Sequence, residues 1–598
     1  VISANLGINA SNTYLNKEVI SKAVKKTVSV AGGLIEEDVK DEIKFKDIYS
    51  DSDLIFEAIA TGLDNFFQSV KTKMENFEPG AHGAVLMTGM QDMISAPLTS
   101  RKDGLMQSEL CVSSEEINPL FMEAKQREIS QGGPNGTSKN SMRNETDARN
   151  LTPTGMNKID PVETPESGKI GFTQHLTVGA VIENNTIKSE FLRVLNGEAI
   201  VGETNKVRLA PAEEENMIIA FNDSRYLKED GNKLVFTQDV VPARYMGKRD
   251  MYPVNKIQYI DAKPQGVLGT SANMIPFVSH NDGARTLMGA AMQKQAVNLV
   301  NREAPMVTTL ADKSTGLTFD QKIGEQNGKP VKSTVNGIVH KITKSHIIVL
   351  GEDGQEYKHS YYNYYPLNQS YINNELRVKV GDKVNEGQLL AEGWQTQGGK
   401  LALGVNARIG YLPFKGYNYE DGVVISESFA QKMTSDEYNE VEILIPKEAK
   451  GGRGSKIKSA LLKETTNASV SLLDEDGIIK IGETIKAGSV LVGYLKEITK
   501  TTDDLLDLIA LGSGKISYKY SEKQVPAGSY VSGKIERITV IDNPDAVNKQ
   551  KIVFSVVKKK PLKLGDKIAG RHGNKGVISR IMPQEDIPFL SLIHISEP

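Results

Sequence analysis

GDKIAGRHGNKG, at Gly565–Gly576, is the stretch of this 598-residue sequence that most constrains its fold. Its four glycines interrupt any regular strand, and glycine lets a backbone turn sharply and approach a ligand closely. Between them stand positively charged or proton-bearing side chains, namely Lys567, Arg571, His572 and Lys575. The stretch is not a Walker loop, because the GK[ST] ending is missing. Its composition leaves two interpretations open, a phosphate-binding loop and a solvated basic turn.

The sequence around this stretch is strongly basic. From Lys551 to Arg580, Asp566 is the only acid beside a run of cations: Lys558, Lys559, Lys560, Lys563, Lys567, Arg571, Lys575 and Arg580. The whole chain has 72 basic and 75 acidic residues and a formal net charge of −3. It is therefore not basic throughout, but a local basic strip is compatible with nucleic-acid binding.

The corner that opens this stretch occurs three times. VKVGDKV at Val378–Val384, IKIGETI at Ile479–Ile485 and LKLGDKI at Leu562–Ile568 alternate apolar and polar residues up to a Gly-acid pair. The pattern predicts a strand that enters a tight corner, and the uneven spacing favours barrel-like or sandwich-like β domains over a solenoid. The first copy is similar to the hammerhead of biotinyl and lipoyl carriers, but no lysine with the flanks of an acceptor follows it.

Length and composition predict several domains, because single cores stop growing at about 250–300 residues. No apolar run is long enough to cross a bilayer, and the single cysteine, Cys111, excludes an internal disulfide and suits a reducing cytoplasm. Asp53–Phe67 has apolar residues every three to four positions, which predicts a mostly helical amino-terminal part. The chain opens on Val1 rather than on methionine, so we expect a fragment or a processed product.

Two adjacent carboxylates form a second candidate site. In GYNYEDGVVISE, at Gly416–Glu427, Glu420 and Asp421 stand directly before an apolar Val-Val-Ile run that predicts a strand. Carboxylates at the start of a strand suit a hard cation such as magnesium, which they usually bind through water. An ordinary acidic turn is the alternative interpretation.

Two further motifs complete the set. PVETPESGKIG, at Pro161–Gly171, predicts a stiff loop because of its two prolines. Asn281–Val297 predicts a helix with Asp282 as N-cap and with Met288 and Met292 in its core-facing stripe. Arg285, near the start of that helix, could reach an anion instead.

Together these four blocks resemble the β subunit of cellular and phage multisubunit DNA-dependent RNA polymerases, and they stand in that family's order. The resemblance also includes NPLFMEAKQREIS (Asn118–Ser130), GGKLALGVNARIGYLP (Gly398–Pro413) and ISRIMPQEDIPF (Ile578–Phe589). It therefore extends over roughly Asn118 to Phe589.

The resemblance implies a nucleotidyltransferase that makes RNA on a DNA template. Lys567 and Lys575 match the lysines that contact the RNA 3′ end and the nucleotide phosphates, and Arg285 matches a phosphate-binding arginine. Glu420 and Asp421 match the acidic pair near the second Mg²⁺, which the resemblance implies they reach through water, so no metal ligand is assigned directly. Further nucleic-acid contacts are implied for Arg571, His572, Asn574, Gln295, Arg127, Ser130, Arg149 and Glu166.

The resemblance also implies partners. Mg²⁺ would be held mainly by an aspartate triad of a β′-like subunit, because no Asp-x-Asp-x-Asp string occurs in this sequence. The chain would be active only with that subunit, and an amino-terminal β piece, an initiation factor, DNA, RNA and nucleoside triphosphates complete the set. No membrane partner is expected.

The implied fold is α+β, multidomain and rich in β structure, with a double-psi β-barrel, a hammerhead or sandwich-like β domain and a mostly helical amino-terminal part. The expected segments are a helical lobe-like part at 1–117, a rifamycin-pocket and fork-loop region at 118–177, an α+β external insertion at 178–260, a helical nucleotide-side segment at 261–330, a hammerhead-like domain at 331–412, a double-psi barrel with a short flap-like insertion at 413–589, and a tail unlike the family at 590–598.

The stretch between Asp421 and Gly565 is short for the cellular family, which predicts a reduced flap and the split polymerases of giant bacteriophages. Such a chain would work in the host cytoplasm or in the virion. Three alternatives remain: a β paralogue that binds nucleic acid without turnover, a single-chain polymerase with two barrels, and a biotinyl or lipoyl carrier. Both lysines, the acidic pair and Arg285 disfavour the first, and the missing aspartate triad and acceptor lysine disfavour the others.

Overall fold

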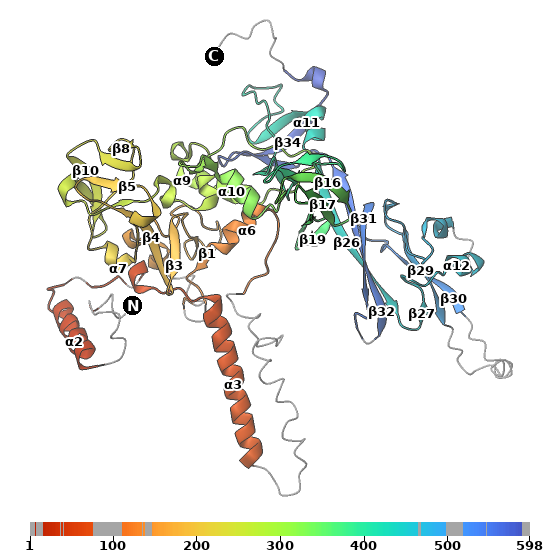
Figure 1. Cartoon of the computed structure of the whole chain (residues 1–598), viewed down its shortest axis with the longest axis horizontal. Helices are drawn as coiled ribbons and strands as arrows, with labels where there is room; N and C mark the ends of the chain where they lie inside the picture. Colours follow the sequence, from red (N-terminus) through yellow and green to blue (C-terminus); the bar gives the residue numbers. More distant parts are fainter. Residues whose placement is uncertain are drawn as a thin grey trace.

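The computed structural model describes residues 6, 16–35, 37–39, 41–75, 111–133, 136–137, 146–464, 468–497, 518–545 and 547–588. The chain is elongated, with one group of sheets at each end and helices α9 and α10 between them (Figure 1). The fold mixes helices and strands and is rich in strands, as predicted. The expected tail at 590–598 lies outside the described residues.

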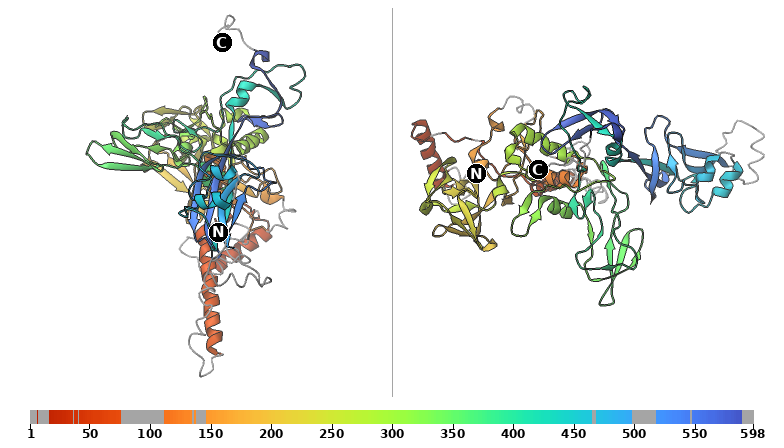
Figure 2. Two further views of the ribbon diagram at one scale, coloured as in Figure 1. Left: turned by 90° about the vertical axis from the view of Figure 1, so that its right-hand side faces the viewer. Right: turned by 90° about the horizontal axis from the view of Figure 1, so that it is seen from above.

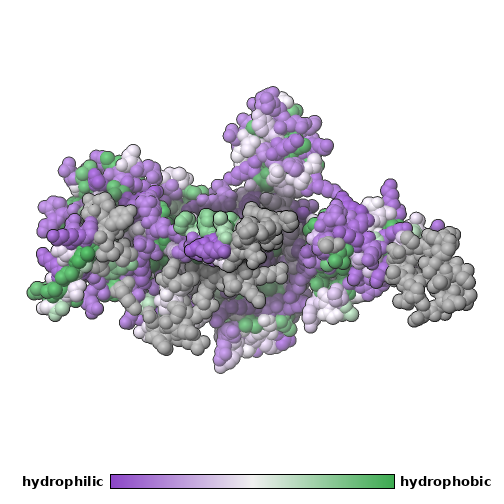
Figure 3. Space-filling model, turned by 90° about the horizontal axis from the view of Figure 1, so that it is seen from below, coloured by the Kyte–Doolittle hydropathy of each residue, from purple (hydrophilic) through white to green (hydrophobic). Residues whose placement is uncertain are grey.

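Two amino-terminal helices are amphipathic. Helix α2 (Lys17–Ala31) begins at Asn16, whose side chain accepts a hydrogen bond from the Val19 amide at 2.9 Å. The predicted helix at Asp53–Phe67 is confirmed as part of α3 (Asp51–Glu75), which points away from the body of the molecule (Figure 1). Both helices leave apolar side chains exposed, and a hydrophobic strip stands out where α2 lies (Figure 3). No described helix has the length and apolarity that a membrane span needs.

The first group of sheets follows residue 178. One sheet has the order β11-β10-β7-β12-β4-β3, with β6 paired to β4, and a smaller sheet has the order β5-β9-β8. The strands of these two sheets are β3 (Ala180–Glu183), β4 (Thr186–Arg193), β5 (Glu198–Ile200), β6 (Lys206–Leu209), β7 (Ile219–Ala220), β8 (Leu227–Asp230), β9 (Lys233–Phe236), β10 (Val240–Tyr245), β11 (Lys248–Pro253) and β12 (Tyr259–Asp261). Leu192, Ala243 and Ile260 belong to their common core.

The centre of the chain is helical. It contains α6 (Pro119–Gln126), α8 (Thr270–Asn273), α9 (Gly283–Lys294) and α10 (Phe319–Gln326). Helix α10 begins with a capping box in which Thr318 accepts from the Gln321 amide and Gln321 accepts from that of Thr318. Leu120 of α6, Met274, and Phe319 and Ile323 of α10 form one apolar cluster. The backbone carbonyl of Met274 accepts a hydrogen bond at 3.5 Å from Arg571, which belongs to the site described below.

Strands dominate after residue 330. A small unit contains β15 (Val331–Lys332), β16 (Gly337–Ile342), β17 (His346–Gly351), β18 (Glu356–Ser360), β21 (Lys383–Val384) and β22 (Leu389–Ala391), and it projects from the body of the molecule (right view of Figure 2). The far end of the chain contains β26 (Ser435–Pro446), β28 (Thr484–Ile485), β31 (Gly533–Asp542) and β32 (Asn548–Lys560) in one sheet, and β27 (Ala449–Lys450), β29 (Val490–Glu497) and β30 (Tyr518–Gln524) in another.

The three predicted corners exist, but the order of strand and corner was wrong. The strand follows the Gly-acid pair in each copy: β21 at Lys383, β28 at Thr484, and β33 (Lys567–Ala569). The glycines Gly381, Gly482 and Gly565 have φ of +96°, +98° and +85°, so the chain turns there before it can pair. Each glycine amide then donates to a neighbouring strand, at Val339, Ile535 and Ile578 respectively.

Candidate functional site

Lys567 and Lys575 lie on one face of a β-hairpin. Strand β33 pairs antiparallel with β34 (Lys575–Met582), and Ala569 stands opposite Lys575 while Lys567 stands opposite Val577. Residues two apart on a strand share a face, so both lysines are on the same side as diagonal neighbours. That side is exposed, whereas Ile568 and Ile578 on the other side join an apolar cluster.

The acidic pair lies at the same end of this sheet. Strand β25 (Gly422–Ser426) runs parallel to β34, with Gly422 opposite Val577. The carbonyl of Asp421 accepts a hydrogen bond from the Val577 amide at 2.9 Å. Both carboxylates are exposed, and Glu420 has a φ of +54°, a left-handed conformation that costs a non-glycine residue energy. The register therefore brings Glu420 and Asp421 beside the strand that Lys575 begins.

The predicted helix at Asn281–Val297 is confirmed as α9, with Asp282 as its N-cap. Asp282 accepts a hydrogen bond from the Ala284 amide at 3.2 Å. The predicted core face was wrong, because the buried residues are Thr286, Gly289, Ala290 and Gln293, while Met288 and Met292 are half-buried. Small residues such as Gly289 and Ala290 lie on the buried face of α9, because this helix packs against the backbone of the glycine-rich loop rather than against side chains.

The contact between α9 and the glycine-rich loop is exceptionally close. A Cβ added to Gly289 would lie 2.3 Å from the carbonyl oxygen of Arg571, and one added to Gly573 would lie 2.4 Å from that of Arg285. The Arg285 guanidinium also donates to the Gly573 carbonyl at 3.0 Å. Arg285, on an exposed turn of α9, is thus fixed to the same loop that leads into Lys575.

The other polar residues of the loop have internal partners. His572 is within 3.1 Å of the Asn281 side chain. The backbone carbonyl of Asn574 accepts from the Gly570 amide at 3.0 Å and closes the turn, and the Asn574 side chain accepts from the His572 amide at 3.3 Å. Arg571 donates to the carbonyl of Val307 at 2.9 Å and is half-buried. His572 and Asn574 remain exposed to a ligand, whereas Arg571 is turned toward the interior.

The remaining predicted contact residues lie on other segments. Arg127 donates to the carbonyls of Thr177 and Ala180, and Arg149 donates to the Ile170 carbonyl at 2.6 Å. Both arginines therefore stabilise the chain around β1 (Glu128–Ser130) and β2 (Thr173–His175). Ser130, Glu166 and Gln295 are exposed, and Gln295 is the C-cap of α9.

The chain matches two protein-family models and several known proteins. Residues 112–182 match the family described as RNA polymerase Rpb2, domain 3, and residues 332–592 match RNA polymerase Rpb2, domain 6. The DNA-directed RNA polymerase subunit beta of Prochlorococcus marinus strain MIT 9301 is 33% identical over 504 residues, which cover 82% of this chain and 44% of that protein. This chain is homologous to the β subunit of DNA-directed RNA polymerase.

Other β subunits are similar to the same extent. That of Phytoplasma australiense is 31% identical over 503 residues, covering 81% of this chain and 39% of its own length. That of Mycoplasmoides gallisepticum is 32% identical over 502 residues, covering 82% of this chain and 35% of its own length. The β-like chain thus spans less than half the length of these curated relatives.

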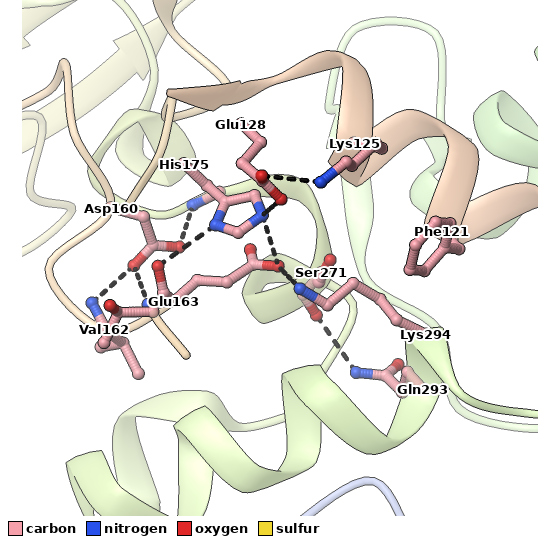
Figure 4. A network of polar contacts seen from close by, with 12 residues as sticks. Phe121, Lys125, Glu128, Asp160, Val162, Glu163, His175, Ser271, Gln293 and Lys294 are labelled. Carbon is pink, nitrogen blue, oxygen red and sulfur yellow. Dashed lines mark hydrogen bonds and ion pairs between the residues drawn. The ribbon is translucent and has the colours of Figure 1, made fainter. Parts of the chain in front are cut away.

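A buried polar network, which the sequence did not indicate, holds α9 of the β-like chain in place (Figure 4). Glu163, 4% exposed, accepts a hydrogen bond from Lys294 in the last turn of α9 at 2.6 Å. His175 of β2 lies 3.8 Å from the same carboxylate. Asp160 accepts from the amides of Val162 at 2.7 Å and Gly269 at 2.6 Å. The loop predicted at Pro161–Gly171 is therefore tied to α9.

Nearby charges determine the direction in which the pKa of the Glu163 carboxylate is shifted. Burial alone would raise the pKa of Glu163, but the nearby charges of His175 and Lys294 outweigh it and lower the pKa below the ordinary value. The pKa of Asp160 is raised by burial, which its backbone hydrogen bonds oppose. Glu163 is consequently the charged partner that Lys294 requires.

Gly289→Ala should destabilise the chain by about 1–3 kcal/mol. The clash of the new Cβ with the backbone of the loop costs more free energy than the gain of about 1 kcal/mol in helix propensity. Gly283→Ala, at the first residue of the same helix, is the control, since its Cβ would meet nothing within 4 Å. Thermal unfolding of both variants measures the difference. Equal stability of the two would show that α9 does not press on the loop.

Glu163→Gln should cost about 1–3 kcal/mol, because it leaves Lys294 without its counter-charge in a half-buried position. Folding lowers the pKa of Glu163 below 4.5, so its contribution is complete above that pH and is lost as the pH falls through the folded-state pKa. Urea unfolding at several pH values should therefore show the variant approaching the parent in acid. Glu166→Gln, an exposed change in the same loop, should have no such effect.

Proposed function

We propose that this chain supplies the half of an RNA polymerase active centre that binds the RNA 3′ end and the phosphates of the incoming nucleotide. The main observation in support is that three groups of charged residues meet around one glycine-rich loop. Lys567 and Lys575 share a face of the hairpin, Arg285 is bonded to the loop, and the Glu420–Asp421 pair lies beside β34. Three cations held in fixed relative positions suit a triphosphate better than they suit a solvated turn. The partners proposed are a β′-like subunit, an amino-terminal β piece, DNA template, RNA transcript, nucleoside triphosphates and an initiation factor, all in the cytoplasm.

The proposed reaction is template-directed nucleotidyl transfer. The RNA 3′ oxygen forms a bond to the α-phosphorus, the bond from that phosphorus to the β-phosphate oxygen breaks, and pyrophosphate leaves. Lys567, Lys575 and Arg285 orient the phosphates and offset the negative charge that develops on their oxygens. Because these groups are held by β-sheet register and by α9, little reorganisation is needed when the charge develops.

Magnesium fits the site only in part. When bound, the metal would polarise the phosphate oxygens and activate the attacking oxygen. Glu420 and Asp421 are the residues of this chain that would face it, and Mg²⁺ prefers six oxygen ligands. No group of three or more metal-ligating side chains exists within the described part of the chain, so we assign the remaining ligands to phosphates, water and a β′-like subunit.

The finer fold assignment belongs to the same proposal. We assign the sheet β25-β34-β33 to a double-psi β-barrel, since a parallel strand pair flanked by a tight antiparallel hairpin suits that architecture. We assign the unit at residues 331–391 to a hammerhead-like domain, on the two Gly-containing corners at Gly381 and Gly387. The bacteriophage origin stays a prediction, and the relatives reported above are bacterial.

Lys567→Ala or Lys575→Ala should lower RNA primer extension about 10²–10³-fold in a complex reconstituted with a β′-like subunit, the loss that follows removal of one preorganised donor. Lys383→Ala is the matched control, because Lys383 occupies the equivalent place in the first Gly-Asp corner. Co-purification should show that every variant still assembles.

Full activity of the Lys567→Ala/Lys575→Ala double variant would refute the assignment. Specific extension by this chain without a partner would overturn the half-site proposal. A wild-type complex that binds nucleic acid but extends no primer would instead support the non-catalytic paralogue.

A further inference from the structure

His175 lies between two carboxylates in the buried network of Figure 4. It is the last residue of β2 and is 5% exposed. Its Nε2 atom lies 3.9 Å from a carboxylate oxygen of Glu128 and 3.8 Å from one of Glu163. Glu128 stands directly opposite on β1, whereas Glu163 belongs to the loop at Pro161–Gly171. One imidazole therefore faces two acids that reach it from separate segments.

The other ring nitrogen of His175 holds the backbone of the same loop. Its Nδ1 atom lies 3.2 Å from the carbonyl oxygen of Glu163. A carbonyl oxygen can only accept, so Nδ1 carries a hydrogen and donates this bond. The backbone carbonyl of His175 in turn accepts from the Asp160 amide at 2.8 Å. His175 thus fixes the backbone of Glu163 and turns its second nitrogen toward the Glu163 carboxylate.

Each of the two carboxylates is paired with a lysine from a different helix. Glu128 accepts a hydrogen bond at 2.7 Å from Lys125, in the last turn of α6. Glu163 accepts one at 2.6 Å from Lys294, in the last turn of α9. The five side chains form a row that runs from α6 to α9, with His175 at its centre (Figure 4).

Burial makes the α9 half of this row the stronger one. The side chains of Lys125 and Glu128 are each 28% exposed, so solvent screens their attraction. Those of Glu163 and Lys294 are only 4% and 17% exposed. A buried acid depends on each of its partners, because water does not replace a partner that is lost. Loss of His175 is therefore felt chiefly at Glu163 and Lys294.

We propose that His175 is a positioning residue for α9. It fixes Glu163, and Glu163 fixes the carboxy-terminal turn of the helix through Lys294. Gln295, the C-cap of α9 and a predicted nucleic-acid contact, directly follows Lys294, and Arg285 lies in the first turn of the same helix. His175 thus sets where α9 presents both residues. Only the kinetic consequence of this inference rests on the proposed function.

Hydrogen exchange of the full-length chain tests the coupling. His175→Leu should speed amide exchange in residues 291–295 about tenfold, since removing a buried partner of Glu163 costs about the free energy of one hydrogen bond. His359→Leu is the matched control. His359 is also buried, and its Nε2 atom has no hydrogen-bond partner among the described residues. It lies on β18, so its loss should leave exchange at 291–295 unchanged.

A double variant tests whether His175 acts through Glu163. Lys294→Met should loosen the same amides, and His175→Leu/Lys294→Met should loosen them no further than the larger single effect, because both changes disrupt one network. Lys125→Met, in the screened half of the row, should have little effect there. Additive effects of His175→Leu and Lys294→Met, or unchanged exchange at 291–295 in His175→Leu, would overturn the proposal.

His175→Asn decides the matter if His175→Leu raises exchange throughout the chain and has therefore unfolded. The asparagine amide can still donate to the Glu163 carbonyl, but it has no counterpart of Nε2. Loosening confined to the last turn of α9 supports the proposal. Exchange like that of the parent at 291–295, or loosening throughout the chain, refutes it.

Kinetics in the reconstituted complex separate this inference from the proposed function. His175→Asn should lower kcat about tenfold and leave KM for the nucleotide within about twofold, as expected when only the position of catalytic groups is disturbed. A role in packing alone would lower thermal stability and leave kcat of the assembled complex unchanged, which contradicts the proposal. Absence of extension by the wild-type complex would overturn the proposed function and leave the exchange result intact.

Discussion

The site depends on one constraint, the direct contact of helix α9 with the backbone of the glycine-rich loop. There is no room for a Cβ at Gly289 or Gly573. A Cβ added at either position would lie within 2.4 Å of a carbonyl oxygen of the opposite segment. Interiors at this packing density transmit displacement rather than absorb it. The helix and the loop therefore move as one body, and Arg285 and Lys575 keep a fixed separation although 290 positions divide them in sequence.

The charges of the site are divided by burial. The groups available to a ligand, which are the two lysines of the hairpin and the adjacent carboxylates at Glu420 and Asp421, are exposed, where ionised side chains keep their hydration. The acid that supports them, Glu163, is buried and accepts a hydrogen bond from Lys294 of α9. Buried ion pairs contribute specificity of position more than net stability.

Local features of this architecture could be predicted from the sequence, and pairings between distant segments could not. The helix at α9 and its Asp282 cap followed from spacing and capping chemistry, as did the helix around Asp53–Phe67. The predicted core face of α9 was wrong because the prediction relied on the hydrophobicity of Met288 and Met292. The surface against which α9 packs is backbone, which favours small residues. Glu163 was missed because a buried acid is recognised by its cation, and Lys294 lies 131 positions away in sequence.

The arrangement also indicates why such a site would need a second chain. In the function proposed above, its cations would form the phosphate clamp, because β-sheet register and α9 fix Lys567, Lys575 and Arg285 within this chain. Its two carboxylates, Glu420 and Asp421, are fewer than a magnesium ion requires, and they lie at an exposed strand mouth rather than in an enclosed cage. A surface that gathers phosphates but holds metal weakly would bind the polyanion in the ground state and stabilise the developing charge only in part. Metal ligands supplied from another chain would then make assembly itself the condition for catalysis.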